Sequence, residues 1–191
     1  MGDVIFLDTN VILDYLEKRN QDVIDIVAQL LHFHSKGKIV IATSVFTVAE
    51  LIDTEFQIRF IGECINDRMS GDEIISKLNK DKELYRQIAE TNKAKVANKV
   101  RDFVVRNQIE VLSLPSSEFW DYEELYKLLY NHLLRPLDAL IVATAISNNV
   151  KYFLSSDMDL IDAVGKLLPH TFSLRDKTQR DTFRDGVLKV I

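Results

Sequence analysis

Four acidic residues stand where a hydrophobic strand pattern gives way to a helix pattern: Asp8, Glu50, Asp138 and Asp157. In an open α/β sheet, ligands bind at the carboxyl ends of the strands, so acids at such transitions are expected to converge on one edge. Clustered carboxylates repel one another unless a cation lies between them, and hard oxygen ligands suit Mg²⁺ or Mn²⁺. The pattern therefore predicts a metal site for phosphate chemistry.

A divalent ion at such a site would acidify water and neutralise charge that develops on phosphate oxygens. Each acid also has a purely structural explanation. Asp8 can accept backbone N–H groups in its turn, Asp138 suits the dipole of a first helical turn after a proline, and Asp157 is a good helix cap. Glu50 is harder to explain in this way, because a carboxylate on an apolar helix face is costly to bury without a partner.

Three polar residues accompany these acids. Asn10 follows Asp8 by two positions and suits the cap of a helix. Asp159 follows Asp157 by two positions and either binds the metal through water or occupies the first turn of its helix. Ser155 carries a hydroxyl just before the last acid.

The surrounding pattern alternates strands and helices. Apolar, β-branched runs predict strands at 3–8, 38–43, 109–114, 151–155 and 171–174. Ser44 is predicted to cap the helix of Glu50, a further helix is expected from Ser116 or Ser117 to about Leu134, and Pro136 is expected to open the helix of Asp138. This alternation predicts a mostly parallel sheet flanked by helices in three α/β/α layers.

Length and composition bound the remaining choices. With 191 residues and 47% apolar content, the chain fits one domain, residues 1–191, in which the long helical stretch over about 55–107 is an insertion. The first residues lack the features of a signal peptide, and no apolar run approaches the roughly 20 residues of a membrane helix. We therefore expect a cytoplasmic protein without a membrane partner.

The helical stretch contains an electropositive segment. Nine Lys or Arg and four acids lie between Lys77 and Arg106, a net charge of +5 in a chain whose net charge is −5. Lys95, Lys99 and Arg106 are candidates for contact with the phosphate backbone of a nucleic acid. The alternative is an ordinary solvated helix face.

With these residues assembled, the chain resembles the PIN-domain ribonucleases, and among them the VapC-type toxins of toxin–antitoxin pairs. Four segments carry the resemblance: Phe6-Leu7-Asp8-Thr9-Asn10-Val11, Thr47-Val48-Ala49-Glu50-Leu51, Leu137-Asp138-Ala139-Leu140-Ile141-Val142-Ala143-Thr144-Ala145 and Tyr152-Phe153-Leu154-Ser155-Ser156-Asp157-Met158-Asp159-Leu160. Serine stands at 155 where members of the family usually have threonine, and the span between Glu50 and Asp138 is long for a compact toxin.

The resemblance implies a parallel sheet and an endoribonuclease that uses Mg²⁺ or Mn²⁺. It assigns metal-binding positions to Asp8, Glu50, Asp138 and Asp157, and supporting positions to Asn10 and Ser155. It further implies RNA as the substrate, an antitoxin-like protein as a partner, and a homodimer.

Two other functions compete with this interpretation. A phosphatase of the haloacid-dehalogenase type would use a strand that ends in an aspartate such as Asp8, but it requires a second acid where Asn10 stands. A non-catalytic PIN-like module would keep the fold and bind RNA or a protein. Metal-dependent cleavage of RNA, with a phosphatase substrate as a control, distinguishes the three.

Overall fold

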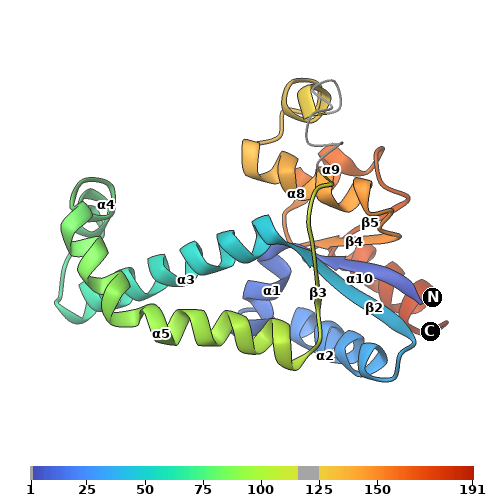
Figure 1. Cartoon of the computed structure of the whole chain (residues 1–191), viewed down its shortest axis with the longest axis horizontal. Helices are drawn as coiled ribbons and strands as arrows, with labels where there is room; N and C mark the ends of the chain where they lie inside the picture. The colour runs from blue at the N-terminus through green and yellow to red at the C-terminus, as the bar shows by residue number, and fades with distance from the viewer. Residues whose placement is uncertain (1, 116–124) are drawn as a thin grey trace. The chain divides into compact units, whose positions relative to one another are not determined.

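The computed structural model describes residues 2–115 and 125–191 (Figure 1). The chain divides into two compact units. The larger unit contains the chain up to Val48 together with the chain from Asn107, and the smaller unit is Ala49–Arg106. The prediction that about 55–107 is an insertion within a single domain stays a prediction. No helix in the described ranges has the length and apolar character needed to cross a membrane.

A five-stranded sheet forms the centre of the larger unit. Its strands are β1 (Asp3–Leu7), β2 (Ile39–Ser44), β3 (Glu110–Leu112), β4 (Tyr152–Ser155) and β5 (His170–Ser173). They lie in the order β3-β2-β1-β4-β5, and each neighbouring pair is parallel. The predicted parallel sheet is therefore confirmed, and each predicted strand segment overlaps an observed strand.

Side-chain alternation along the central strands supplies a core on each face of the sheet. Phe6 of β1 and Phe153 of β4 are register partners, and their rings stack with centroids 5.3 Å apart. Both rings belong to a buried cluster that also contains Ile141 and Leu160. The neighbouring residues of β1, Ile5 and Leu7, are also fully buried, and alternation directs them to the opposite face.

Helices cover both faces of this sheet. In the larger unit they are α1 (Thr9–Leu16), α2 (Gln21–Ser35), α8 (Pro136–Ser147), α9 (Met158–Val164) and α10 (Lys177–Phe183), with π-helical turns η1 (Lys127–Asn131) and η2 (Arg184–Leu188). In Figure 1, α8 and α9 lie on one side of the sheet, and α1, α2 and α10 lie on the other. The predicted three-layer arrangement is confirmed. The predicted helix start at Ser116 or Ser117 lies outside the described residues.

The strand order creates a switch point between β1 and β4. From β1 the chain adds β2 and then β3 on one side, and it later adds β4 and β5 on the other side. In open parallel sheets, the carboxyl ends of strands at such a point border a crevice that binds ligands. Asp8 directly follows β1, and Asp157 lies two residues beyond the end of β4. The topology therefore places these two acids at the switch point.

The smaller unit is helical. It contains α3 (Val45–Asn66) from Ala49 onward, α4 (Gly71–Lys80) and α5 (Lys82–Arg106). Its buried apolar cluster is Phe60, Cys64, Ile74 and Ile88. The helix α4 starts with a capping box, in which the Ser70 hydroxyl accepts the backbone N–H of Glu73 and the Glu73 carboxylate accepts the backbone N–H of Ser70.

Candidate active site

Asp8 is held at the end of β1 by contacts with β4. It occupies the N-cap position of α1, and its backbone N–H donates to the carbonyl oxygen of Leu154 at 3.0 Å. Its residue is only 2% exposed. The Ser155 hydroxyl donates to Asp8 Oδ2 at 2.7 Å. Asp8 is thus a buried carboxylate with a dedicated donor from the neighbouring strand.

The same hydroxyl also orients Asp157. The backbone N–H of Asp157 donates to Ser155 Oγ at 2.9 Å. Asp157 Oδ1 accepts the backbone N–H groups of Asp159 and Leu160, at 3.0 and 3.2 Å, so the residue also caps α9. Ser155 itself is fully buried. One hydroxyl therefore connects the two acids across the switch point. The helix-capping explanation for Asp157 is also observed, so the residue has both contacts.

A second serine–carboxylate pair lies beside the first. The Ser156 hydroxyl donates to Asp14 Oδ2 at 2.8 Å, and both residues are almost completely buried. Sequence reasoning missed Asp14. The available signal was an acid on an otherwise apolar stretch of α1, next to Ile12 and Leu13, since such a carboxylate needs a buried partner. The two consecutive serines of the β4–α9 segment are thus both anchored to carboxylates of the β1–α1 segment.

An open cavity of about 330 Å³ lies over this segment. Its lining residues are Asn10, Ser156, Asp157, Met158, Asp159 and Arg175. Three residues predicted from the sequence, namely Asn10, Asp157 and Asp159, are therefore brought to one cavity. Arg175 is an addition that sequence reasoning missed. It follows β5 by two positions, so the strand-end rule that selected the acids would also have selected this residue.

Asp138 lies in the first turn of α8, after Pro136 at the start of the helix, as predicted. In Figure 1, α8 starts near the edge of the sheet that is formed by the carboxyl ends of β1 and β4. Arg135 binds the Asp138 carboxylate with two hydrogen bonds, 2.7 Å from Nε to Oδ2 and 3.3 Å from Nη2 to Oδ1. The arginine side chain is 72% exposed. The Asp138 side chain is only 13% exposed, so the arginine caps a carboxylate that is itself largely covered.

Glu50 lies on α3 and belongs to the smaller unit. The helix starts as predicted, because the backbone N–H of Thr47 donates to Ser44 Oγ at 2.9 Å. The larger unit by itself connects Asp8 with Asp157 and brings Asp159 and Asn10 to the cavity. The convergence of all four predicted acids on one metal stays a prediction.

The donor set fits Mg²⁺ in one specific sense. Within residues 2–115 and 125–191, no group of three or more His, Cys, Asp or Glu side chains is arranged to hold an ion. Mg²⁺, however, is usually bound by one or two carboxylates, several waters and substrate phosphates, and it rarely occupies a cage made only of protein groups. Two carboxylates at the switch point, Asp8 and Asp157, match that requirement in ligand type and in number.

The three basic candidates lie on α5 of the smaller unit, and they differ in their contacts. Lys99 Nζ binds both oxygens of Glu55, at 2.8 and 3.0 Å, and Glu55 is only 1% exposed. Burial lowers the pKa of Lys99. Arg106 pairs with Asp102 at 2.8 Å, and Lys95 is exposed. Lys99 thus has a structural partner, and RNA contact by these three residues stays a prediction.

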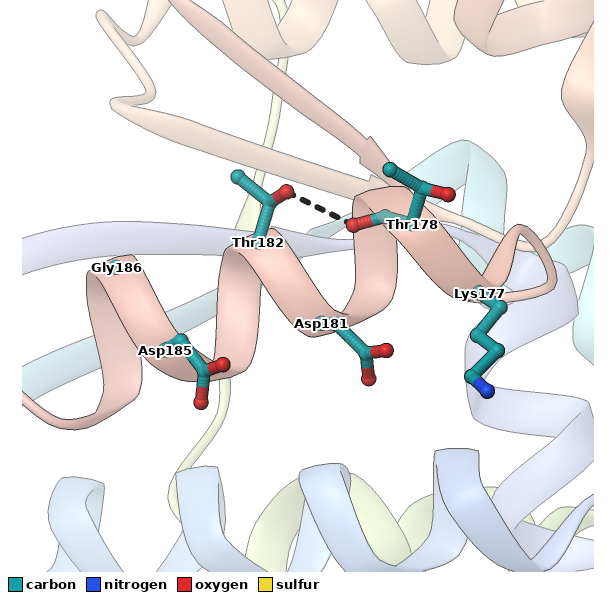
Figure 2. A pocket seen from close by; sticks show the side chains of 6 residues that line it. All are labelled: Lys177, Thr178, Asp181, Thr182, Asp185 and Gly186. Carbon is teal, nitrogen blue, oxygen red and sulfur yellow. Dashed lines mark hydrogen bonds between the residues drawn. The ribbon is translucent and has the colours of Figure 1, made fainter.

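A second cavity, of about 630 Å³, runs along α10 and η2 (Figure 2). It is lined by Lys177, Thr178, Asp181, Thr182, Asp185 and Gly186, and none of these residues was predicted to belong to the site. Its two acids form ion pairs along their own helical segment, with Arg184 and Lys189 respectively. This cavity therefore offers a charged but internally compensated surface.

Comparison with known proteins adds a family and a fold. The family model described as PIN domain matches residues 56–167, more than half of the chain. The match includes Asp138, Asp157 and Asp159, whereas Asp8 and Glu50 precede it. No curated protein matches the sequence.

A similar solved chain comes from the crystal structure of VapBC2 from Rickettsia felis bound to a DNA fragment from their promoter. It is 17% identical in sequence with a TM-score of 0.54, and the alignment covers 89% of this chain and 99% of the other. At this identity, the likeness is one of fold.

Proposed function

Because the chain belongs to the PIN domain family, we propose that it is an endoribonuclease dependent on Mg²⁺ or Mn²⁺, with its site at the carboxyl ends of β1 and β4. PIN domains are generally nucleases and typically use divalent metals. The observation that carries the proposal is the Ser155 hydroxyl, which connects Asp8 and Asp157 across the switch point. A buried serine between two strand-end acids suits a site that must hold carboxylates in a set geometry.

Asp8 and Asp157 would hold the ion, and Asp159 and Asn10 would face its water or the substrate from the cavity. Asp138 and Glu50 would complete the acidic set that the family resemblance assigns. When bound, the ion supplies charge neutralisation on the phosphate and makes water more acidic. The contribution of the protein is positional, because Ser155 and the N-terminal backbone of α9 restrict the rotamers of both acids before any ion arrives.

We further propose that the protein is a VapC-type toxin, with RNA as substrate, an antitoxin-like protein as partner and a homodimeric state. Support comes from the shared fold with a chain of the VapBC2 crystal structure from Rickettsia felis. Co-purification with the product of a neighbouring gene, together with growth arrest on expression of the protein alone, tests this part. Growth unaffected by the folded protein would remove the toxin assignment and leave the nuclease proposal in place.

The decisive comparison uses two buried acids of the β1–α1 segment. Asp8→Asn and Asp14→Asn make the same chemical change at residues that are each 2% exposed and each bonded to a serine. We expect Asp8→Asn to lower Mn²⁺-dependent cleavage of labelled single-stranded RNA by roughly 10²–10³-fold, as when an electrostatic group at a reacting centre is removed. Asp14→Asn should keep most of the activity at temperatures where both variants are folded.

Each outcome has a separate meaning. Cleavage that persists in Asp8→Asn, or in EDTA, would show that the activity lies elsewhere or comes from a contaminant. RNA binding without cleavage by the unaltered protein in Mn²⁺ would favour the non-catalytic module. Hydrolysis of p-nitrophenyl phosphate in place of RNA would favour a phosphatase.

A further inference from the structure

Arg175 lies on the wall of the cavity that contains Asp157 and Asp159. Its side chain is exposed. In the part of the chain that the structure describes, it forms neither an ion pair nor a side-chain hydrogen bond, although two carboxylates line the same cavity. Arg135 and Arg180 differ, because Arg135 binds Asp138 and Arg180 binds Asp22. Among the described residues, the guanidinium of Arg175 is therefore available to bind a ligand beside Asp157 and Asp159.

The backbone on both sides of Arg175 is anchored to the sheet and to α10. The backbone N–H of Leu174 donates to the carbonyl oxygen of Ser155 at 2.9 Å, which joins this segment to the end of β4. The carbonyl oxygen of Leu174 accepts from Arg180 Nη1 at 3.1 Å. On the other side, the backbone N–H of Asp176 donates to Ser173 Oγ at 3.3 Å. The arginine thus extends from a fixed point near Ser155.

We propose that Arg175 binds a phosphate of the RNA and positions it beside the carboxylates of Asp157 and Asp159, which line the same cavity. This inference rests on the nuclease activity proposed above and adds a substrate contact to the same site. A guanidinium matches phosphate geometry with two parallel N–H···O bonds and stays protonated, so Arg175 transfers no proton and acts as a positioning residue. It also counters the repulsion that a polyanion meets at an acidic cavity in a chain of net charge −5.

The site thus combines two opposite charges with separate tasks. The acids would hold the cation, and Arg175 would hold the anion, on neighbouring parts of one cavity wall. A phosphodiester placed between them is fixed in orientation, which lowers the entropic cost of reaction. RNA should therefore bind this edge measurably even when no divalent ion is present.

Lys177 provides a matched control. It lies two residues after Arg175, is exposed, and lines the separate cavity along α10 (Figure 2). Arg175→Gln and Lys177→Gln therefore remove the same formal charge from the same part of the chain. Only the first removes it from the cavity of Asp157. Arg175→Lys keeps the charge and loses the planar fork.

The test measures the affinity for a short labelled single-stranded RNA in EDTA at several salt concentrations, and separately kcat and KM in Mn²⁺. We expect Arg175→Gln to weaken RNA binding in EDTA by about 10-fold or more, as for loss of charge-assisted hydrogen bonds. The slope of log affinity against log salt should fall by about 0.7, which corresponds to one phosphate of a single strand. In Arg175→Gln, KM should rise by a larger factor than kcat falls. Arg175→Lys should restore the salt slope but not the full affinity. Lys177→Gln should behave as the unaltered protein.

Equal effects of Arg175→Gln and Lys177→Gln would overturn the proposal and leave Arg175 as a surface charge. The failure of the nuclease proposal gives a different result. The unaltered protein would then not cleave RNA in Mn²⁺, whereas the phosphate contact would still be visible in the EDTA binding data. Thermal melting of all three variants should match that of the unaltered protein, because the Arg175 side chain makes no described contact that its loss would break.

Discussion

Removal of the Ser155 hydroxyl should damage both stability and metal binding. Ser155 is fully buried and makes two hydrogen bonds, one to the Asp8 carboxylate at 2.7 Å and one from the backbone N–H of Asp157 at 2.9 Å. A bond to a charged group contributes about 1.5–3 kcal/mol and a neutral one about 0.5–1.5 kcal/mol. Ser155→Ala should therefore lower the free energy of unfolding by about 2–4 kcal/mol, or the melting temperature by roughly 5–15 °C.

Ser156→Ala is the matched control for this change. It removes the neighbouring hydroxyl and its bond to Asp14 at 2.8 Å, so its loss of stability should be similar, about 1.5–3 kcal/mol. It leaves the connection between Asp8 and Asp157 intact. Stability alone will therefore not distinguish the two variants, and the distinguishing measurement is their affinity for the metal ion.

Calorimetric titration with Mn²⁺ supplies that measurement. Residues that orient metal ligands typically change metal affinity by about 10–100-fold when they are removed. We expect a loss of that size in Ser155→Ala, and an affinity close to that of the unaltered protein in Ser156→Ala. Ser155→Thr keeps the hydroxyl and should retain the affinity. A Ser155→Ala protein that loses less than about 1 kcal/mol, or that binds Mn²⁺ as well as Ser156→Ala does, would refute the positioning role of this hydroxyl.

Two predictions concern the smaller unit. Lys99→Met removes two hydrogen bonds from the buried Glu55 carboxylate and should lower the free energy of unfolding in chemical denaturation by about 3 kcal/mol. Lys95→Met, at an exposed position, should change it by less than about 0.5 kcal/mol. Equal effects would contradict the structural role of Lys99. Burial, together with the charge of Asp53 and the hydrogen bond donated to it, raises the pKa of Tyr85 to about 12. Because the folded protein favours the protonated phenol, this group contributes stability that is complete below about pH 10 and is lost as the pH rises through 12. Absorbance titration should show a late-ionising tyrosine that is missing in Tyr85→Phe.

The sequence alone was enough to predict the strands and the acids at their ends. The central strands β1, β2 and β4 are short, mostly apolar runs of β-branched and aromatic residues, and each acid of the switch point follows such a run within two positions. Because parallel strands end at one edge, the side of the sheet on which Asp8 and Asp157 lie also followed from local pattern. Capping was equally local, and the predicted cap at Ser44 is present.

Only the tertiary structure decided which groups are neighbours. The order β3-β2-β1-β4-β5 depends on packing between segments distant in sequence, and it places β1 next to β4 although about 145 residues separate them. The contacts of Ser155 with Asp8 and of Ser156 with Asp14 follow from that adjacency. For Arg175, local pattern gives its place after β5, whereas the structure shows that it shares a cavity with Asn10 of the distant β1–α1 segment.

Charge patterns along the chain carried the least information about partners. Lys99 belongs to the electropositive stretch in the sequence, but in the structure it binds the buried Glu55 across the helical unit. A count of charges cannot distinguish these two situations, because a lysine with a long flexible stem reaches either solvent or a neighbouring helix. Residue types and periodicity determine where strands and helices form, whereas the partner of each charged side chain is decided by the packing that brings distant segments into contact.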